Sequence, residues 1–431
     1  MDTIFALSSG PAPAGVAIIR VSGPLAQDSL RNLTSGEPLP VPRHATRRHV
    51  IDPDSLTQID DALILSFPQP NSYTGEDVVE YQVHGGRAIV DALLAALAKQ
   101  NRHRFAEAGE FTKRAVLNNR LDLTQAEAVH DLILAETEAQ RTQALAQYGG
   151  MLSRLYDGWR EKLLRSLAYV EAHLDFPDEA LPADLLAQIL PEIEQLESDI
   201  VSHLSDGHLG ERLREGFHVV IAGAPNAGKS TLLNALARRE VAIVSPIAGT
   251  TRDVLEVPLN LGGFPVLLID TAGLRDDSTD PIEAEGIRRA RERIENADLR
   301  ILLLDPTMAV NGQMEEADLI VWSKADIAPP PPGALAVSAH EGQGLSDLVA
   351  SITAKLKSRT AKRGGLGPTR ERHRSALDQV VFHVKQSQSA QLPELLAEDL
   401  RLAARALGEI TGRVHVEDLL DVIFRDFCIG K

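Results

Sequence analysis

The chain has 431 residues, enough for two or three domains that each bury a hydrophobic core. Its 44 Lys and Arg against 61 Asp and Glu give a formal net charge of −17, which argues against general nucleic-acid binding through surface charge. A lone cysteine, Cys428, excludes an internal disulfide, and the lack of a secretory leader or of any run of about 18 apolar residues predicts a cytoplasmic chain without a membrane span.

Residues 1–117 are expected to form a mixed α/β domain. Apolar runs at 15–21, 62–67 and 77–84 have the length and content of strands. The Ala- and Leu-rich run 87–99 is typical of a helix.

Two charged residues interrupt the first and third of these strands. Arg20 lies inside one and Glu80 inside the other. Either each side chain points to solvent from an exposed strand face, or the two form a buried pair that lines a polar pocket. The pattern alone leaves both interpretations open.

Residues 118–213 are expected to be helical. A Thr-x-x-Glu capping box at Thr124 and Glu127 predicts the start of a helix that continues to about residue 147. Gly149 and Gly150 would end it. Two more long amphipathic helices are expected at 152–174 and 185–204, the latter containing Pro191.

A phosphate-binding loop follows, at the start of a domain expected over 214–358. The apolar strand 218–222 runs into G-A-P-N-A-G-K-S at 223–230, and a helix follows. This strand–loop–helix context is what a Walker A match requires, because loop amides and the helix N-terminus then face an anion. Lys229 would neutralise the β- and γ-phosphates during cleavage, and Ser230 would offer a hydroxyl to Mg²⁺. The predicted loop contacts are Asn226, Ala227, Gly228, Lys229, Ser230 and Thr231.

Four more nucleotide elements follow in order: G-T-T-R-D at 249–253, D-T-A-G at 270–273, S-K-A-D at 323–326 and S-A at 338–339. Thr251, in G-T-T-R-D, can reach Mg²⁺ when a γ-phosphate is bound, and Asp270 ends the apolar strand 264–269. Asp326, after the strand 319–322, can accept from N1–H and the 2-amino group of guanine, a donor pair that adenine lacks, so we predict GTP as the ligand. The other predicted contacts are Thr271, Ala272, Gly273, Lys324, Ser338 and Ala339.

The guanine motif departs from its usual form at one position. Most GTPases begin it with Asn, whose side chain braces the phosphate loop, and this chain has Ser323. The shorter side chain is expected to weaken nucleotide affinity while Asp326 preserves guanine selectivity.

The nucleotide domain is expected to be a doubly wound sheet inserted into the helical domain, whose second half occupies 359–431. Helices are expected at 370–386, 393–410 and 416–427. The basic stretch 355–374 favours a solvated linker over an RNA contact. The fold class is therefore multidomain α/β, with an N-terminal α+β domain, a helical domain and an inserted P-loop GTPase domain.

Five motifs lie outside the nucleotide elements, and the last two of them are specific, whereas the phosphate loop alone fits many GTPases. The five motifs are P-N-S-Y-T-G-E-D at 70–77, H-G-G at 84–86, G-E-F-T at 109–112, N-x-R-L-D-L-T-Q-A-E at 118–127 and F-C-I-G-K at 427–431. With the nucleotide motifs, they resemble the MnmE (TrmE) family of tRNA-modification GTPases over essentially the whole chain.

That resemblance implies a function and partners. A family member and the flavoprotein MnmG (GidA), in a heterotetramer or larger complex, add a carboxymethylaminomethyl-type group to C5 of the wobble uridine of certain tRNAs. The one-carbon unit comes from 5-formyl- or methylene-tetrahydrofolate, and the N-terminal domain is folate-binding-like and forms a homodimer. By position, the folate contacts would be Arg20, Glu80, Arg120 and Lys431, with Cys428 as a possible further participant. Arg120 replaces a frequent Lys, which keeps the charge but changes the hydrogen-bond geometry.

The resemblance also implies how GTP is cleaved. Leu274 stands where Ras-like enzymes carry glutamine, and a K⁺ ion would supply the missing positive charge. Its ligands would be Asn226, Ser245, Ile247 and Thr250. The water-orienting residue would be Glu283, with Glu285 as a competitor because the spacing from Asp270 is one residue longer than expected.

Two other functions fit the nucleotide motifs. A ribosome-assembly GTPase would bind rRNA, and it should carry a basic RNA-binding appendage. A nucleotide-gated scaffold would turn over negligible GTP. The acidic folate-type domain and the C-I-G-K tail favour the tRNA-modification enzyme.

Overall fold

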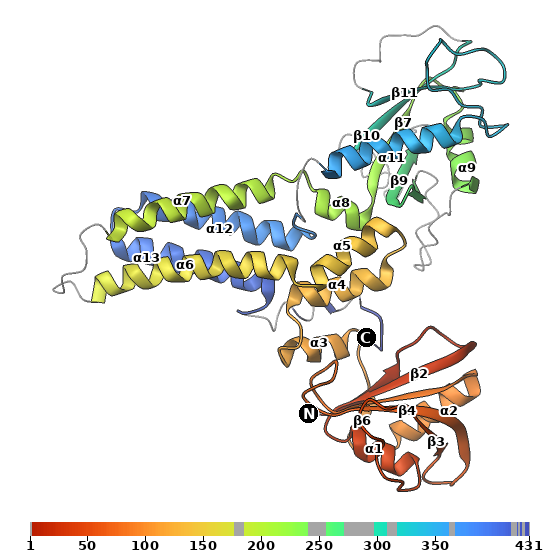
Figure 1. Cartoon of the computed structure of the whole chain (residues 1–431), viewed down its shortest axis with the longest axis vertical. Helices are drawn as coiled ribbons and strands as arrows, with labels where there is room; N and C mark the ends of the chain where they lie inside the picture. Colours follow the sequence, from red (N-terminus) through yellow and green to blue (C-terminus); the bar gives the residue numbers. More distant parts are fainter. Residues whose placement is uncertain are drawn as a thin grey trace, which may run out of the picture. The chain divides into compact units, whose positions relative to one another are not determined.

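A computed structural model describes most of the chain, and Figure 1 traces its elements in order. The described residues are 2–175, 185–239, 256–270, 297–307, 317–361, 367–414, 420, 423–424 and 427–430. They form two compact units, residues 1–130 with 408–431 and residues 131–407. Among the described helices, none is both long enough and apolar enough to cross a bilayer.

The first unit is built on a six-stranded sheet of order β3-β4-β5-β2-β1-β6. Only the β1–β6 pair is parallel. The strands are β1 (Thr3–Leu7), β2 (Ala14–Ser22), β3 (Thr46–Ile51), β4 (Gln58–Phe67), β5 (Val78–Gly85) and β6 (His103–Phe105). The three strands and the helix expected from the sequence in this part are all present.

The two faces of this sheet bury different helices. Phe5 of β1 belongs to a core that includes residues of α1 (Ala26–Leu33) and α2 (Arg87–Ala98). Its neighbours Ile4 and Ala6 pack instead with Phe111 of α3 (Glu110–Leu117). Successive strand residues point to opposite faces, so α3 lies on the face away from α1 and α2.

The helix expected from Thr124 to about residue 147 is interrupted. The structure has two helices, α4 (Leu123–Leu134) and α5 (Glu138–Tyr148). The predicted capping box is wrong: Asp122 caps α4, since its carboxylate accepts from Gln125 N at 2.9 Å and the Gln125 side chain accepts from Asp122 N at 3.1 Å. Thr124 and Glu127 are buried inside the helix. A second capping box, with Thr137 as N-cap, begins helix α5.

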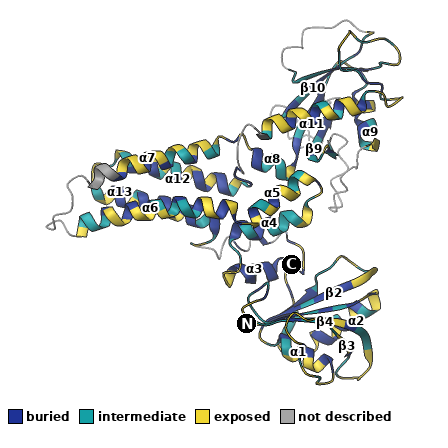
Figure 2. Cartoon of the chain, in the orientation of Figure 1, coloured by how far each residue is buried: buried dark blue, intermediate teal, exposed yellow. Residues whose placement is uncertain are grey.

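Long helices form a bundle in the second unit. They are α6 (Met151–Asp175), α7 (Leu185–Leu204), α12 (Glu371–Ser389) and α13 (Pro393–Thr411), and they confirm four of the expected helices. Figure 1 shows the four lying alongside one another, and Figure 2 shows their buried and exposed faces. Pro191 lies inside α7. The expected helix at 416–427 falls largely outside the described residues.

The nucleotide domain contains a five-stranded sheet of order β11-β10-β7-β9-β8, in which only β8 is antiparallel. The strands are β7 (Phe217–Ala222), β8 (Glu256–Leu261), β9 (Phe264–Asp270), β10 (Leu299–Leu304) and β11 (Leu319–Trp322). Helices α9 (Lys229–Arg239) and α11 (Leu345–Ala361) pack on it, and α8 (Leu209–Glu215) precedes it. The fold class is therefore as expected, although β10, next to the central strand, was not predicted.

Candidate functional site

The phosphate loop connects the end of β7 to the start of α9. Gly223 needs to be glycine, because a Cβ there would lie 2.5 Å from the Leu303 carbonyl oxygen of β10. Gly228 has φ +96° and Asn226 has φ 64°, both in the left-handed region. The loop therefore takes its shape from residues that tolerate this backbone and from the close approach of β10.

The Lys229 side chain folds back over this loop. Its ammonium donates to the carbonyl oxygens of Gly223 at 2.9 Å and of Ala224 at 3.0 Å. Lys229 is buried. A buried ammonium held at the centre of a loop before a helix N-terminus is suited to neutralising phosphate charge.

Ser230 and Asp270 meet at the carboxyl ends of two neighbouring parallel strands. Ile221 of β7 stands opposite Asp270 of β9, and the Ser230 hydroxyl donates to Asp270 Oδ2 at 2.6 Å. Asp270 is buried. A hydroxyl and a carboxylate oxygen side by side are hard oxygen donors, which fit Mg²⁺.

A cavity of about 430 Å³ joins this loop to the guanine motif. Asp326 is one of its lining residues, and the hydrogen bond from the Ser338 side chain lowers the pKa of that carboxyl. An ionised acceptor is what the N1–H and 2-amino edge of guanine requires. The lining residues are Asn226, Gly228, Lys229, Ser230, Thr231, Leu232, Ser323, Lys324, Asp326, Ile327, Val337, Ala339 and His340.

Ala227 is buried within the loop and packs in the core of the nucleotide domain, and Ser338 is fully buried. The structure thus brings together the predicted nucleotide residues that it describes. The remaining predicted residues lie outside the described part: Ser245, Ile247, Thr250, Thr251, Thr271, Ala272, Gly273, Glu283 and Lys431.

In the N-terminal domain, Arg20 and Glu80 stand directly opposite each other on β2 and β5. Arg20 Nε donates to Glu80 Oε1 at 2.9 Å, and the two side chains are 18% and 16% exposed. The guanidinium lies 5.4 Å from the Tyr73 ring centroid and 5.6 Å from that of Phe111. Of the two interpretations of these charges, the structure supports the pair, since the two side chains bind each other and are only partly exposed.

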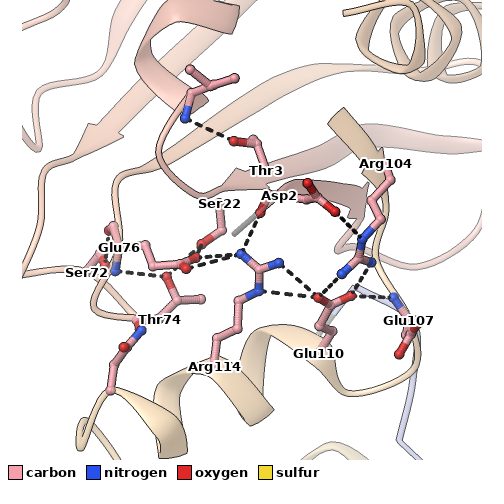
Figure 3. Close-up of polar contacts among 12 residues, drawn as sticks. Asp2, Thr3, Ser22, Ser72, Thr74, Glu76, Arg104, Glu107, Glu110 and Arg114 are labelled. Atoms are coloured by element: carbon pink, nitrogen blue, oxygen red, sulfur yellow. Dashed lines mark hydrogen bonds and ion pairs between the residues drawn. The ribbon is translucent and has the colours of Figure 1, made fainter. Parts of the chain in front are cut away.

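Tyr73 and Phe111 belong to two segments that a buried ionic network ties together. The Tyr73 hydroxyl lies 2.8 Å from Thr112 Oγ1 of α3. In the same two segments, Figure 3 shows Arg114 of α3 between the carboxylates of Glu76, at 3.0 Å, and Glu110, at 2.9 Å. The network fixes the loop that carries Tyr73 against the helix that carries Phe111.

The C-terminal tail lies against the same domain. Ser8 Oγ donates to Gly430 O at 2.7 Å, and Ile429 forms a β-bridge with Ala108. The Cys428 thiol is free and exposed. Arg120 is exposed, and its methylenes pack beside Gly75, where a Cβ would lie 3.2 Å from Arg120 Cγ.

Sequence reasoning missed several residues of these sites. Tyr73 and Phe111 were noted only as parts of motifs, and Arg114 and Asp305 were not noted at all. Asp305 directly follows the apolar run of β10, and a carboxylate at the end of a strand was the available signal.

Comparison with known proteins covers nearly the whole chain. The family described as GTP-binding protein TrmE N-terminus matches residues 3–120, and the MnmE helical domain matches residues 123–428. The chain is 52% identical over 440 residues to the tRNA modification GTPase MnmE of Parvibaculum lavamentivorans and 50% identical over 456 residues to that of Rhodospirillum rubrum, with all of each chain covered. It is 45% identical over 469 residues to the mitochondrial 5-taurinomethyluridine tRNA synthase subunit GTPB3 of Danio rerio, covering 100% of this chain and 93% of that protein.

Proposed function

The chain belongs to the MnmE family of tRNA-modification GTPases, and from that premise we propose that it hydrolyses GTP to support modification of the wobble uridine of certain tRNAs. The added group would be of the carboxymethylaminomethyl type at C5. Its one-carbon unit would come from a tetrahydrofolate, and a flavin-dependent partner of the MnmG type would take part.

One observation carries the nucleotide half of this proposal. A single cavity joins a buried Lys229 ammonium at one end to the Asp326 carboxylate at the other. A guanine nucleotide carries phosphates at one end and a donor pair on its base at the other, so it matches both ends of the cavity. Lys229 would bind the phosphates and stabilise the charge that develops during cleavage.

Two metal ions are part of the proposal. The oxygens of Ser230 and Asp270 suit Mg²⁺, which would draw charge from the phosphates. Asn226 would provide a side-chain oxygen to K⁺. Its proposed partners, Ser245, Ile247 and Thr250, and the water-orienting Glu283 lie outside the described residues.

The N-terminal site would hold the folate. A pterin ring presents an N–H and an amino group that can donate to a carboxylate such as Glu80, and a carbonyl oxygen that can accept from Arg20. The aromatic faces of Tyr73 and Phe111 hold the Arg20 guanidinium in place before any ligand binds. The docked tail at Gly430 would bring Lys431 to this domain.

The proposed partners follow from the same family. They are a second copy of the chain, a flavoprotein of the MnmG type and the tRNA substrate, in the cytoplasm. Because the chain has a formal net charge of −17, we expect most of the tRNA contacts to come from local basic segments or from the flavoprotein.

A deletion strain tests this function directly. Nucleosides from its tRNA should lack the modified wobble uridine, and the wild-type gene should restore it while Lys229→Ala should not. A full set of modified wobble uridines in the deletion strain would contradict the function, and a ribosomal precursor defect in its place would support the rRNA-binding alternative.

A further inference from the structure

Asp305 lies at the carboxyl end of β10, just outside the predicted guanine motif. Its side chain is 2% exposed. Oδ1 accepts from the Thr307 N–H at 2.9 Å and from the Thr307 hydroxyl at 2.7 Å, while Oδ2 accepts from Lys324 Nζ at 2.6 Å. Thr307 thus fixes the carboxylate through one oxygen, while the other oxygen binds Lys324.

Lys324 is the residue that this carboxylate holds. It lines the nucleotide cavity and has φ 54°, a left-handed conformation that a residue with a side chain adopts only where its surroundings stabilise it. The Lys324 side chain is 33% exposed, whereas that of Asp305 is almost fully buried. The ion pair is therefore shielded from solvent on the Asp305 side. The bond from Lys324, with that from Thr307, lowers the pKa of Asp305 to about 2, and the pair therefore stays charged at physiological pH.

Ser323 attaches the same segment to the same strand. It donates its backbone N–H to Leu304 O at 2.8 Å and its hydroxyl to the same oxygen at 3.1 Å. Two consecutive residues of the guanine motif are therefore bound to two consecutive residues at the end of β10. The Ser323 side chain is thus directed toward this strand.

We propose that Asp305 is a positioning residue for the guanine base, acting through Lys324 on the segment that ends at Asp326. This inference rests on the proposed function, since it presumes that the cavity binds a guanine nucleotide. The ion pair holds Lys324 in its left-handed conformation. That conformation directs the next two residues so that Asp326 meets Ser338. In this chain the end of β10 holds the guanine motif in place.

The test uses Asp305→Asn in the full-length protein. The amide oxygen still accepts from Thr307 and keeps the side-chain shape, so the change removes chiefly the negative charge that Lys324 binds. With GDP carrying a fluorescent ribose label, we expect dissociation in a stopped-flow experiment to be about tenfold faster, which is the scale of one charged hydrogen bond. The affinity for unlabelled GDP should fall by a similar factor.

Asp318→Asn is the matched control. Asp318 precedes β11 at the opposite end of the same strand pair, where its carboxylate accepts from Arg300 N at 2.9 Å and pairs with Arg359 at 3.2 Å. It has the same chemistry away from the cavity. GDP dissociation from this variant should match the wild type, and an equal acceleration in both variants would overturn the proposal.

A double-mutant cycle separates positioning from general weakening of the fold. Lys324→Met removes the partner, so Asp305→Asn should have little further effect on GDP release in that background. Full additivity of the two changes would overturn the proposal. If Asp305→Asn does not fold, Asp305→Ser takes its place in the cycle: little further effect in the Lys324→Met background supports the proposal, and full additivity contradicts it. Failure of the wild type to bind GDP would instead reject the proposed function.

Discussion

The Ser230 hydroxyl and the Asp270 carboxylate lie 2.6 Å apart although 40 positions separate them in the chain. The parallel pairing of β7 with β9 brings them together. Asp270 is the last residue of β9, and the loop that leads to Ser230 begins at the carboxyl end of the adjacent strand β7. The two oxygen donors are thus in place within the folded nucleotide domain, and binding a cation there needs little rearrangement of the backbone.

Removing one of these oxygens should uncouple nucleotide binding from Mg²⁺. In the wild type, we expect labelled GDP to dissociate faster when EDTA removes Mg²⁺, and in Ser230→Ala we expect the rate to be nearly the same with and without the metal. Ser351→Ala, which removes a hydroxyl from the exposed face of α11, should behave as the wild type. A full Mg²⁺ effect in Ser230→Ala would exclude this residue as a ligand.

GTP hydrolysis should depend on the alkali cation. We expect turnover to be at least about tenfold faster in KCl than in NaCl at equal ionic strength, because one unit of positive charge at the phosphates lowers the barrier by more than 1.4 kcal/mol. Asn226→Gly removes the amide while tolerating φ 64°, so its rate in KCl should fall to that in NaCl. Equal rates of the wild-type protein in both salts would remove the cation role.

The Arg20–Glu80 pair should be needed for folate but not for nucleotide. Arg20→Met should weaken binding of 5-formyl-tetrahydrofolate by about tenfold or more in calorimetry, because it removes a charged donor. Affinity for GDP should not change. Arg48→Met is the control, since Arg48, on β3 of the same sheet, forms an ion pair with Glu37. Unchanged folate affinity in Arg20→Met would place the folate site elsewhere.

The helical bundle should lose stability in mild acid through His203. The pKa of His203 is lowered from its ordinary 6.5 to about 4, chiefly because the imidazole is buried. The charges of Arg374 and His373 also lower this pKa, and the charge of Asp206 raises it. The unfolded chain therefore binds a proton between these values that the folded chain does not, and stability falls as the pH drops through this window, by up to about 3 kcal/mol.

His203→Gln tests this effect, because glutamine can still bond the Tyr156 hydroxyl, which lies 3.1 Å from His203 Nε2, but does not titrate. The loss of thermal midpoint between about pH 7 and about pH 5 should be smaller in this variant than in the wild type. Replacing the exposed His44 in the same way should leave the loss unchanged. Equal pH dependence in all three proteins would exclude His203 as the cause.

The sequence was most informative where local chemistry decides the structure. The phosphate loop and the long bundle helices follow from glycine conformation and apolar periodicity. The start of α4 was assigned to Thr124, since two overlapping capping patterns, Asp122-x-x-Gln125 and Thr124-x-x-Glu127, compete at this point and only burial distinguishes them.

Long-range pairs could not be predicted in this way. Asp305 and Lys324 meet because β10 and β11 are neighbours in the sheet, and no local pattern records that neighbour relation. The register of β2 and β5 likewise decides that Arg20 faces Glu80. The four-part division at 117, 213 and 358 stays a prediction, as does the choice between Glu283 and Glu285, both outside the described residues.

The most direct test is the base preference of the purified protein and of its Asp326→Asn variant. We predict that the wild type binds GDP at least about a thousandfold more tightly than ADP, because adenine leaves the Asp326 carboxylate without donors. The amide of Asp326→Asn can donate to a 2-carbonyl, so this variant should lose GDP affinity and gain affinity for xanthosine diphosphate. Equal or tighter binding of ADP by the wild type would contradict a guanine-nucleotide cavity.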